Sequence, residues 1–250
     1  GINQFVSENR TTVDLDYQGR YAIGRHDILW GLNYRSSEDE ITANEPYISI
    51  NGRAYTQNNT GIFIHDDWTL IPERLKLGAG IRADQTSANG TNYSTNASLL
   101  WTPSRTDSLW LKYAQAPRTS ARAERDVSIL SGVAVVPSGF GFDIPVISYT
   151  HSNSNLGPEK AQGVEIGYRK QFSSAVSADI SAYRYRYTNL RTGNLTGQFA
   201  CNVAFGALYN QPKCMYFGLD TLPVMFVETQ TINGLAGWSD GLELSADWMV

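Results

Sequence analysis

Hydrophobic and polar residues alternate with a period of two along most of the chain. In the clearest segment, 75–84, Leu, Leu, Ala and Ile fall on one face, while Lys, Gly, Gly and Arg fall on the other. Because successive side chains of a β-strand point to opposite faces, this pattern predicts a strand and excludes an amphipathic helix. The same template predicts about nine strands, at 13–18, 28–35, 60–69, 75–84, 93–101, 108–113, 161–169, 176–188 and 241–250.

One of these segments, 176–188, changes face part of the way along. Its apolar residues from Val176 to Ala182 share one face, whereas Tyr183, Tyr185 and Tyr187 continue on the other. Two explanations stay open: a β-bulge near Ala182, or a polar upper portion that projects above a membrane.

The connections between the strands are alternately short and long. Those at 24–27, 70–74, 102–107 and 170–174 are short, 85–92 is intermediate, and 36–59, 117–158 and 190–232 are long. In an antiparallel meander this order gathers the tight turns at one end and the long loops at the other, which is typical of outer-membrane barrels. We therefore predict an all-β fold, an antiparallel up-and-down transmembrane β-barrel segment.

The composition agrees with a barrel in a membrane. Charged residues are only 18% of the chain, and there are 14 Tyr and 6 Trp, whose apolar rings with polar tips suit a membrane interface. No run approaches the roughly 18 to 20 apolar residues of a membrane-spanning helix. A net charge of −4 without basic stripes argues against a nucleic-acid partner. Seven aromatic residues are expected on the outward face: Tyr17, Tyr34, Tyr93, Trp101, Tyr113, Tyr168 and Trp248.

Four segments, in family order, resemble TonB-dependent outer-membrane receptors. The first, 62–84, is similar to the family's hairpin with "D-x-W", "R-L" and "G-x-R-Y-D". The second, 116–125, resembles "R-T-P-S-R-A-E-R", although Ser120-Ala121 replaces Pro-Ser. The third, 155–168, resembles "N-L-x-P-E" followed by "E-x-G", and the fourth, Gly241-Leu242-Glu243-Leu244, resembles "G-V-E-L".

The resemblance implies an active transporter for an iron–siderophore complex, or less readily another bulky nutrient, in the bacterial outer membrane. Residues 1–250 are expected to be part of a barrel of about 22 strands, with the plug domain, the TonB box and the remaining strands outside this sequence. The implied partners are TonB, acting through the plug, a ferric siderophore or similar nutrient, the lipid bilayer and lipopolysaccharide.

The resemblance also implies where a ligand could bind. The connection 117–158 carries arginines near its start and aromatic residues near its end, which could pair with and stack on an anionic chelate; packing of the loop on its neighbours or on lipopolysaccharide phosphates is equally open. The candidate ligand-binding residues are Arg118, Arg122, Arg125, Tyr149 and His151. The candidate lumen-facing residues are Arg82, Asp84, Glu165, Arg169 and Glu243, which could contact a plug or pair with one another.

Two cysteines, Cys201 and Cys214, lie in one irregular stretch. An oxidised loop in an exported protein is favoured, and two unpaired thiols are the alternative.

Catalysis has little support in the sequence. It has no G-x-S-x-G, phosphate-loop or H-E-x-x-H motif, and we expect no enzyme, no cofactor and no metal site. His26, His65 and His151 lie far apart, and the neighbours of His65 in His65-Asp66-Asp67 alternate between faces. Two other functions stay open: a general porin or channel, and a soluble exported β-protein that binds or hydrolyses glycans. A protein that stays folded and monomeric without detergent would favour the soluble alternative.

Overall fold

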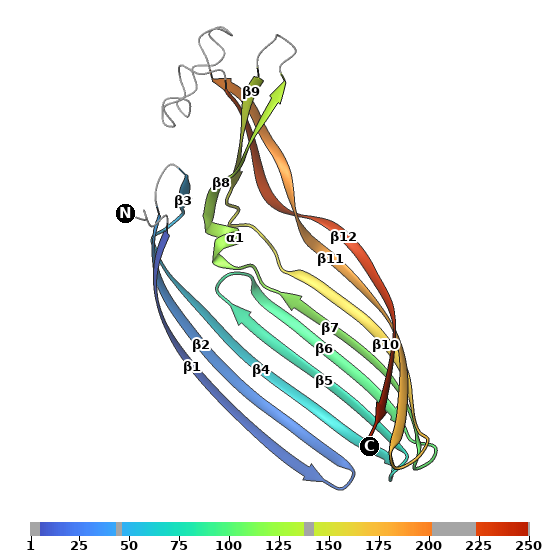
Figure 1. Cartoon of the computed structure of the whole chain (residues 1–250). Helices are drawn as coiled ribbons and strands as arrows, with labels where there is room; N and C mark the ends of the chain where they lie inside the picture. The colour runs from blue at the N-terminus through green and yellow to red at the C-terminus, as the bar shows by residue number, and fades with distance from the viewer. Residues whose placement is uncertain (1–5, 44–46, 138–142, 202–223, 250) are drawn as a thin grey trace.

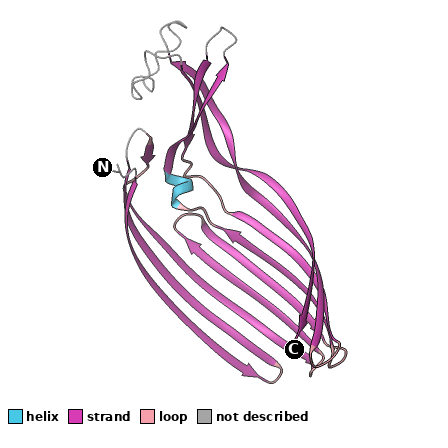
Figure 2. Ribbon diagram, in the orientation of Figure 1, coloured by secondary structure: helices cyan, strands magenta, loops and turns pink. Residues whose placement is uncertain are grey.

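The computed structural model describes residues 6–43, 47–137, 143–201 and 224–249. These residues form one twisted β-sheet and one short helix (Figure 1, Figure 2). The strand order across the sheet is β1-β2-β4-β5-β6-β7-β10-β11-β12-β9-β8-β3. The elements are β1 (Val6–Ile23), β2 (His26–Ala43), β3 (Ile48–Ile50), β4 (Ala54–Ile71), β5 (Leu75–Thr86), β6 (Gly90–Trp101), β7 (Asp107–Arg118), α1 (Arg122–Asp126), β8 (Val127–Pro137), β9 (Asp143–His151), β10 (Glu159–Gln171), β11 (Val176–Cys201) and β12 (Val224–Trp248).

A wall of antiparallel strands makes up most of the sheet. It runs from β1 through β2, β4, β5, β6, β7, β10 and β11 to β12, and each strand pairs with the next one in this order. Each of the nine segments predicted from the period of two overlaps one of these strands. The predicted all-β, up-and-down meander is therefore confirmed.

The four turns predicted at 24–27, 70–74, 102–107 and 170–174 gather at the lower end of the wall in Figure 1. Residues with positive φ, Gly24 at 58° and Glu73 at 60°, reverse the chain in two of these turns, and backbone hydrogen bonds close them, such as Arg74 N–H to Ile71 O at 3.1 Å. Turns this short hold neighbouring strands in one register.

Several strands are longer than their apolar alternation predicts. Segments 36–59 and 190–232 were expected to be connections, but β2 continues to Ala43, β4 begins at Ala54, β11 continues to Cys201 and β12 begins at Val224. The reason is that backbone pairing needs no apolar face, so a ladder can continue where the alternation has stopped.

The connection expected at 85–92 is also shorter than predicted. β5 ends at Thr86 and β6 begins at Gly90, so only residues 87–89 join them. The predicted alternation of short and long connections therefore does not hold at this hairpin. Figure 1 shows α1 lying above the tip of the hairpin.

The sequence indicated one long loop at 117–158, but this connection contains regular structure. It contains α1, β8 and β9, and β9 pairs in parallel with β12 from Met225↔Val146 to Gln230↔His151. The far edge of β8 pairs with β3, which belongs to the connection between β2 and β4. Pairing between residues so distant in sequence leaves no local pattern, which is why it was missed.

The register of β11 decides between the two explanations offered for residues 176–188. Its register with β12 is unbroken from Val176 to Tyr187, and the first shift lies between Tyr187 and Leu190. A bulge near Ala182 is therefore excluded, and the upper portion of the strand is polar on the face that is apolar below.

The wall is one layer thick, so few side chains are buried. The buried hydrophobic residues all lie at the upper end or in its connections: Ile41, Ile147, Leu156, Val224 and Phe226. Within the described residues, no helix is long and apolar enough to cross a membrane.

Candidate functional site

The register of the wall separates one apolar face from one polar face. On one face Leu111, Ile166 and Ala182 lie side by side across three strands, and on the other Lys112, Glu165 and Tyr183 do so. Large apolar side chains stay exposed on the first face, for example Leu244 at 75% and Trp248 at 77%. Leaving apolar surface in water costs about 25 cal/mol of free energy per Å², so this face requires an apolar environment. The register places all seven aromatic residues expected on the outward face on the apolar side.

The five candidate lumen-facing residues all lie on the polar face. Arg82 donates to Asp84 at 2.7 Å and to Asn33 at 2.6 Å. Glu165 accepts from Trp110 at 2.6 Å and from Lys112 at 3.1 Å, and Arg169 pairs with Asp179 at 2.7 Å. Glu243 lies opposite Ser181. Arg82, Asp84, Glu165 and Arg169 thus make pairs within the wall; whether these five residues contact a plug stays a prediction.

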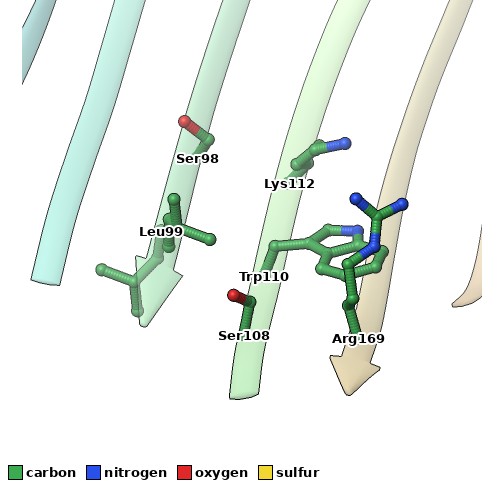
Figure 3. Close-up of a pocket in the computed structure, with 7 residues that line it drawn as sticks. Ser98, Leu99, Ser108, Trp110, Lys112 and Arg169 are labelled. Atoms are coloured by element: carbon green, nitrogen blue, oxygen red, sulfur yellow. The ribbon is translucent and has the colours of Figure 1, made fainter. Parts of the chain in front are cut away.

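A shallow pocket of about 450 Å³ opens on this polar face, near the tight turns. Figure 3 shows the side chains of Trp110 and Arg169 next to one another, with Lys112 above them, Ser98 at the upper left and Ser108 below Trp110. The Lys112 ammonium lies 5.6 Å from the centre of the Trp110 ring. The pocket therefore offers cations and an aromatic surface to whatever lies against the polar face.

A ladder of tyrosines continues the polar face towards the upper end. Tyr183, Tyr185 and Tyr187 are half-buried on β11, with ring centroids 5.4 and 6.4 Å apart. The rings lie against two glycines of the neighbouring strands, since a Cβ on Gly163 would come within 2.1 Å of Tyr185 and one on Gly241 within 2.2 Å of Tyr183. These two glycines let the rings lie flat on the sheet and line an aromatic surface.

At the upper end, α1 is anchored to the wall through Arg122. The side chain of Arg122 is 4% exposed and forms ion pairs with Asp39 of β2 and, at 3.8 Å, with Asp126. It also donates to the backbone oxygens of Gly52 and Arg53, and its guanidinium lies 5.5 Å from the ring centre of Tyr55. We call this contact between α1 and the β2–β4 connection the α1 latch. Its buried charges are paired with one another, although Asp39 Oδ1 and the Nε and Nη1 of Arg122 form no hydrogen bond.

Arg118 holds the other side of the α1 segment. It donates to Glu124 at 2.7 Å and to Glu159 at the start of β10. Glu124 also accepts from the backbone N–H of Ala121 at 2.9 Å. Burial opposes the charged form of Glu124, but the hydrogen bonds from Arg118 and Ala121 outweigh it and lower the pKa of this carboxyl below its usual 4.5.

Two of the family-like segments meet beside α1. The Ser120 hydroxyl, which is buried, donates to the backbone oxygen of Leu156 at 3.1 Å, and Asn89 donates to the same oxygen at 2.6 Å. Arg191 donates to Ser120 at 2.6 Å and to the backbone oxygen of Gly157 at 2.8 Å. Residues 116–125 and 155–168 are thus joined through a shared hydrogen-bond network that fixes the upper connections.

The five candidate ligand-binding residues fall into two groups. Arg118, Arg122 and Arg125 lie around α1, and the guanidinium of Arg125 lies 5.9 Å from the ring centre of Tyr55. Tyr149 and His151 lie on β9, with ring centroids 5.0 Å apart, and His151 is 3.2 Å from Glu228. The arginines already have partners within the protein, and a ligand-binding role for all five stays a prediction.

Sequence reasoning missed Asn89, Ser120 and Arg191, which join the two family-like segments. The only available signal was their polarity beside a turn or strand end, which is common to many surface residues. In the part of the chain that the structure describes, no group of His, Cys, Asp and Glu could hold a metal ion. The expected bond between Cys201 and Cys214 lies outside the residues whose side chains are described.

A one-layer sheet with an exposed apolar face, a polar face and tight turns at one end defines the wall of a transmembrane β-barrel. The chain belongs to the TonB dependent receptor-like, beta-barrel family, whose model matches residues 2–250. This is an outer-membrane family of Gram-negative bacteria, so the resemblance seen in the sequence is confirmed. A comparison with curated protein sequences gave no match.

Solved structures of receptors and transporters share the fold. The siderophore receptor PirA from Pseudomonas aeruginosa has 14% identity and a TM-score of 0.65, over 96% of this chain and 40% of that chain. A mutant of the ferric enterobactin receptor PfeA from Pseudomonas aeruginosa has 16% identity and a TM-score of 0.68, over 96% and 33%. The copper transporter OprC has 14% identity and a TM-score of 0.61, over 98% and 35%. The chain spans 33 to 40% of the length of these proteins.

Proposed function

We propose that this chain forms part of the wall and extracellular connections of an outer-membrane transporter that imports a ferric siderophore. The cargo binds at the extracellular end of the lumen and passes inward when TonB moves a plug. The chain supplies binding surface and enclosure, and no covalent chemistry is required of it. The family membership favours this function over a general porin and over a soluble glycan-binding or glycan-cleaving protein.

The tyrosine ladder carries the proposal. Tyr183, Tyr185 and Tyr187 line the polar face just above the height at which the opposite face stops being apolar. They therefore belong to the extracellular half of the lumen wall, below the connections that a cargo must pass. Stacked phenol rings offer a flat aromatic surface with hydroxyl groups, which suits a bulky chelate that carries its own aromatic or carbonyl oxygen groups.

This proposal separates the five predicted ligand-binding residues into candidate contacts and residues that hold α1 in place. Tyr149 and His151 on β9 are candidate contacts at the mouth, where an imidazole and a phenol lie together. Arg118 and Arg122 instead hold α1 in place through their carboxylate partners. Arg125 is the remaining arginine of this group, and it lies beside Tyr55 at the same end of the wall.

The polar face gives a reason to expect a plug. Arg82, Asp84, Glu165, Arg169 and Glu243 form a charged lining that is compatible with water or with a polar domain, and the Trp110 pocket offers such a domain an indentation. The outer edge of β1, and the edge of β12 that faces away from β11 over residues 231–248, have no strand partner among the described residues. Because lipid cannot satisfy free backbone groups, further strands complete the barrel.

Uptake of a radiolabelled ferric siderophore by cells that make the full-length protein tests the proposal. Replacing Tyr183, Tyr185 and Tyr187 together with Ala should weaken cargo binding roughly tenfold, because each aromatic contact contributes about 0.5 kcal/mol or more. The matched triple Tyr→Phe variant keeps the rings and should retain most of the affinity. Equal amounts of each variant in the outer membrane are the control.

Three results would contradict the proposal in different ways. Uptake that persists in cells lacking TonB would exclude energised transport. Unchanged binding in the triple Ala variant would exclude the tyrosine ladder as the cargo surface. Uptake of copper ions in place of every iron chelate would exclude the siderophore while leaving an active transporter in place.

A further inference from the structure

The apolar face of the wall ends abruptly towards the upper end. Across β10, β11 and β12, the residues Ile166, Ala182 and Leu242 lie side by side and are all apolar. Two residues higher on the same face, β11 carries Arg184 and β12 carries Asp240, while β10 still carries the apolar Val164. Since a strand rises about 3.3 Å per residue, the face of β11 and β12 changes from apolar to charged within roughly 7 Å.

Above this border the face is cationic on β10 and β11. Arg186 follows Arg184 on the same side of β11, and Lys160 lies a further row up on β10, opposite Thr188. All three side chains are exposed, and Asp240 is the carboxylate among them. The border therefore has an excess of positive charge on the side that faces lipid, not on the side that faces the lumen.

The two arginines are positioned by an aromatic ring. The guanidinium carbons of Arg184 and Arg186 lie 4.8 and 5.5 Å from the ring centre of Trp238 on β12. Stacking on an indole restricts an arginine while leaving its N–H groups able to donate. Trp238 is itself 59% exposed on this face, as expected for a residue at a membrane interface.

The arginines also keep donors available. Arg184 contacts Asp240 through Nε at 3.1 Å, and both side chains remain more than half exposed, at 65% and 59%. Among the described residues, no carboxylate pairs with Arg186. An exposed ion pair of this kind is worth little, so a stronger anion can displace Asp240 at small cost.

A groove of about 220 Å³ lies beside these arginines on the same face. Tyr113 of β7, Gln162 and Val164 of β10, and Trp238 of β12 line it together with Arg184 and Arg186. In the groove, Tyr113 and Val164 lie in one row with Arg184, and Gln162 and Trp238 lie in the next row up with Arg186. Because the face below the groove is apolar at Ile166 and Ala182, the groove suits an amphipathic lipid with its acyl chain below and its phosphate beside the arginines.

We propose that Arg184 and Arg186, stacked on Trp238, bind a phosphate of the lipopolysaccharide headgroup in the outer leaflet. The inference rests on the outer-membrane orientation given under the proposed function, with the tight turns on the periplasmic side. Paired guanidinium groups recognise phosphate oxygens through charge-assisted hydrogen bonds, and the adjacent apolar face holds the acyl chains. The site fixes the depth of the wall and anchors β11 below the long extracellular ribbon that it forms with β12.

Lipid retention by the full-length protein in detergent tests this site. Native mass spectrometry would compare bisphosphorylated lipid A, the same lipid after enzymatic dephosphorylation, and phosphatidylcholine. The wild type should retain bisphosphorylated lipid A at least tenfold better than the dephosphorylated form, because each charge-assisted hydrogen bond is worth about one order of magnitude in affinity. Equal retention of the two forms would overturn the proposal without any variant.

The variant R184Q/R186Q should lose at least tenfold in affinity for bisphosphorylated lipid A. The matched control R20Q/R35Q also removes two exposed arginines that each pair with an aspartate, but both lie on the polar face. Its lipid retention should equal that of the wild type. An equal loss in both variants would show a general charge effect and would overturn the assignment to Arg184 and Arg186.

A competition arm separates lipid from free phosphate. Inorganic phosphate at the concentration of the lipid should not displace it, because the groove adds apolar contacts that free phosphate lacks; full displacement would contradict a lipid site. The assay measures lipid retention and not uptake. A failed siderophore experiment therefore leaves its result unchanged, and a failed lipid experiment leaves the cargo proposal standing.

Discussion

Replacing Arg122 with Met should open the α1 latch while leaving the wall intact. Arg122 is the cation between two carboxylates whose side chains are only 6% and 9% exposed, those of Asp39 and Asp126. Methionine keeps much of the side-chain volume and removes the charge. The two carboxylates then lose the buried cation between them. Asp39 keeps only the half-exposed Arg10, which lies 3.6 Å away, and burial opposes the charged forms of both carboxylates.

The magnitude follows from the burial of these groups. Removing one partner of a buried ion pair costs about 3 to 5 kcal/mol, because the other partner stays desolvated and unpaired. Opening the latch hydrates both carboxylates and avoids this cost. Since Arg10 still offsets part of this cost at Asp39, the open form should gain roughly a hundredfold or more in population relative to the wild type.

Hydrogen exchange measures the opening at two backbone positions. The N–H of Asn51 bonds to the Asp126 oxygen at 2.7 Å, and that of Leu130 bonds to the Tyr47 oxygen at 2.9 Å. Both amides should exchange faster in R122M, whereas wall amides such as that of Ile64 should not. The matched control is R125M, which removes a neighbouring arginine whose contact is a 3.4 Å hydrogen bond to the Tyr55 hydroxyl, and it should change exchange little.

A second substitution separates charge from shape. In R122M, a further Asp39→Asn change removes one of the two buried carboxylate charges and should restore part of the protection. Unchanged exchange at Asn51 and Leu130 in R122M would refute the reasoning. Equal acceleration throughout the wall would refute it as well, because the latch would then be part of the global fold.

Two more predictions concern the tyrosine ladder and the Arg118 cluster. Gly163→Val places side-chain carbons where Tyr185 now lies, and it should lower the free energy of unfolding by about 1 to 3 kcal/mol in a urea titration. The control is Gly132→Ala, which should not lower it, because nothing lies within 4 Å of the new Cβ. Equal stability of the two variants would contradict the close packing of Tyr185 on Gly163. The lowered pKa values of Glu124 and Glu159 mean that their contribution is present above the usual carboxyl value of 4.5 and is lost as pH falls through the lowered values. Protection of residues 119–126 against hydrogen exchange, corrected for intrinsic rates, should therefore decrease as the pH falls below 4.5 in wild type but not in E124Q/E159Q. The same decrease in the variant would assign it to other groups.

The wall was predictable because a membrane imposes a strict local rule. A strand with lipid on one side and a polar lumen on the other must alternate, so segments such as 75–84 and 161–169 could be assigned without knowledge of their neighbours. The tight turns were predictable for a similar reason, since Gly24 and the residues around Pro72 favour chain reversal. The expected faces of the aromatic residues followed from the same alternation.

The upper part of the molecule was not predictable from local patterns. Strands β3, β8 and β9 pair with partners far away in sequence, and the ribbon of β11 and β12 continues where neither face must be apolar. The partner of Arg122 is Asp39, and nothing in either segment indicates the other. Sequence reasoning could therefore identify arginines beside the connection, but it could not show that Arg118 and Arg122 already form ion pairs with carboxylates.

The pairing of β3 with β8 also ties two distant connections of the wall to each other. It joins Ile48 in one connection to Ile129 in another, with several wall strands between the two connections. Because closing a longer loop costs more chain entropy than closing a local hairpin, this ladder should form after the hairpins of the wall. Once the ladder and the Asp39–Arg122 pair have formed, separating the two connections breaks backbone hydrogen bonds and exposes buried charges. The strands between the two connections are therefore held together at this end as well as at the tight turns.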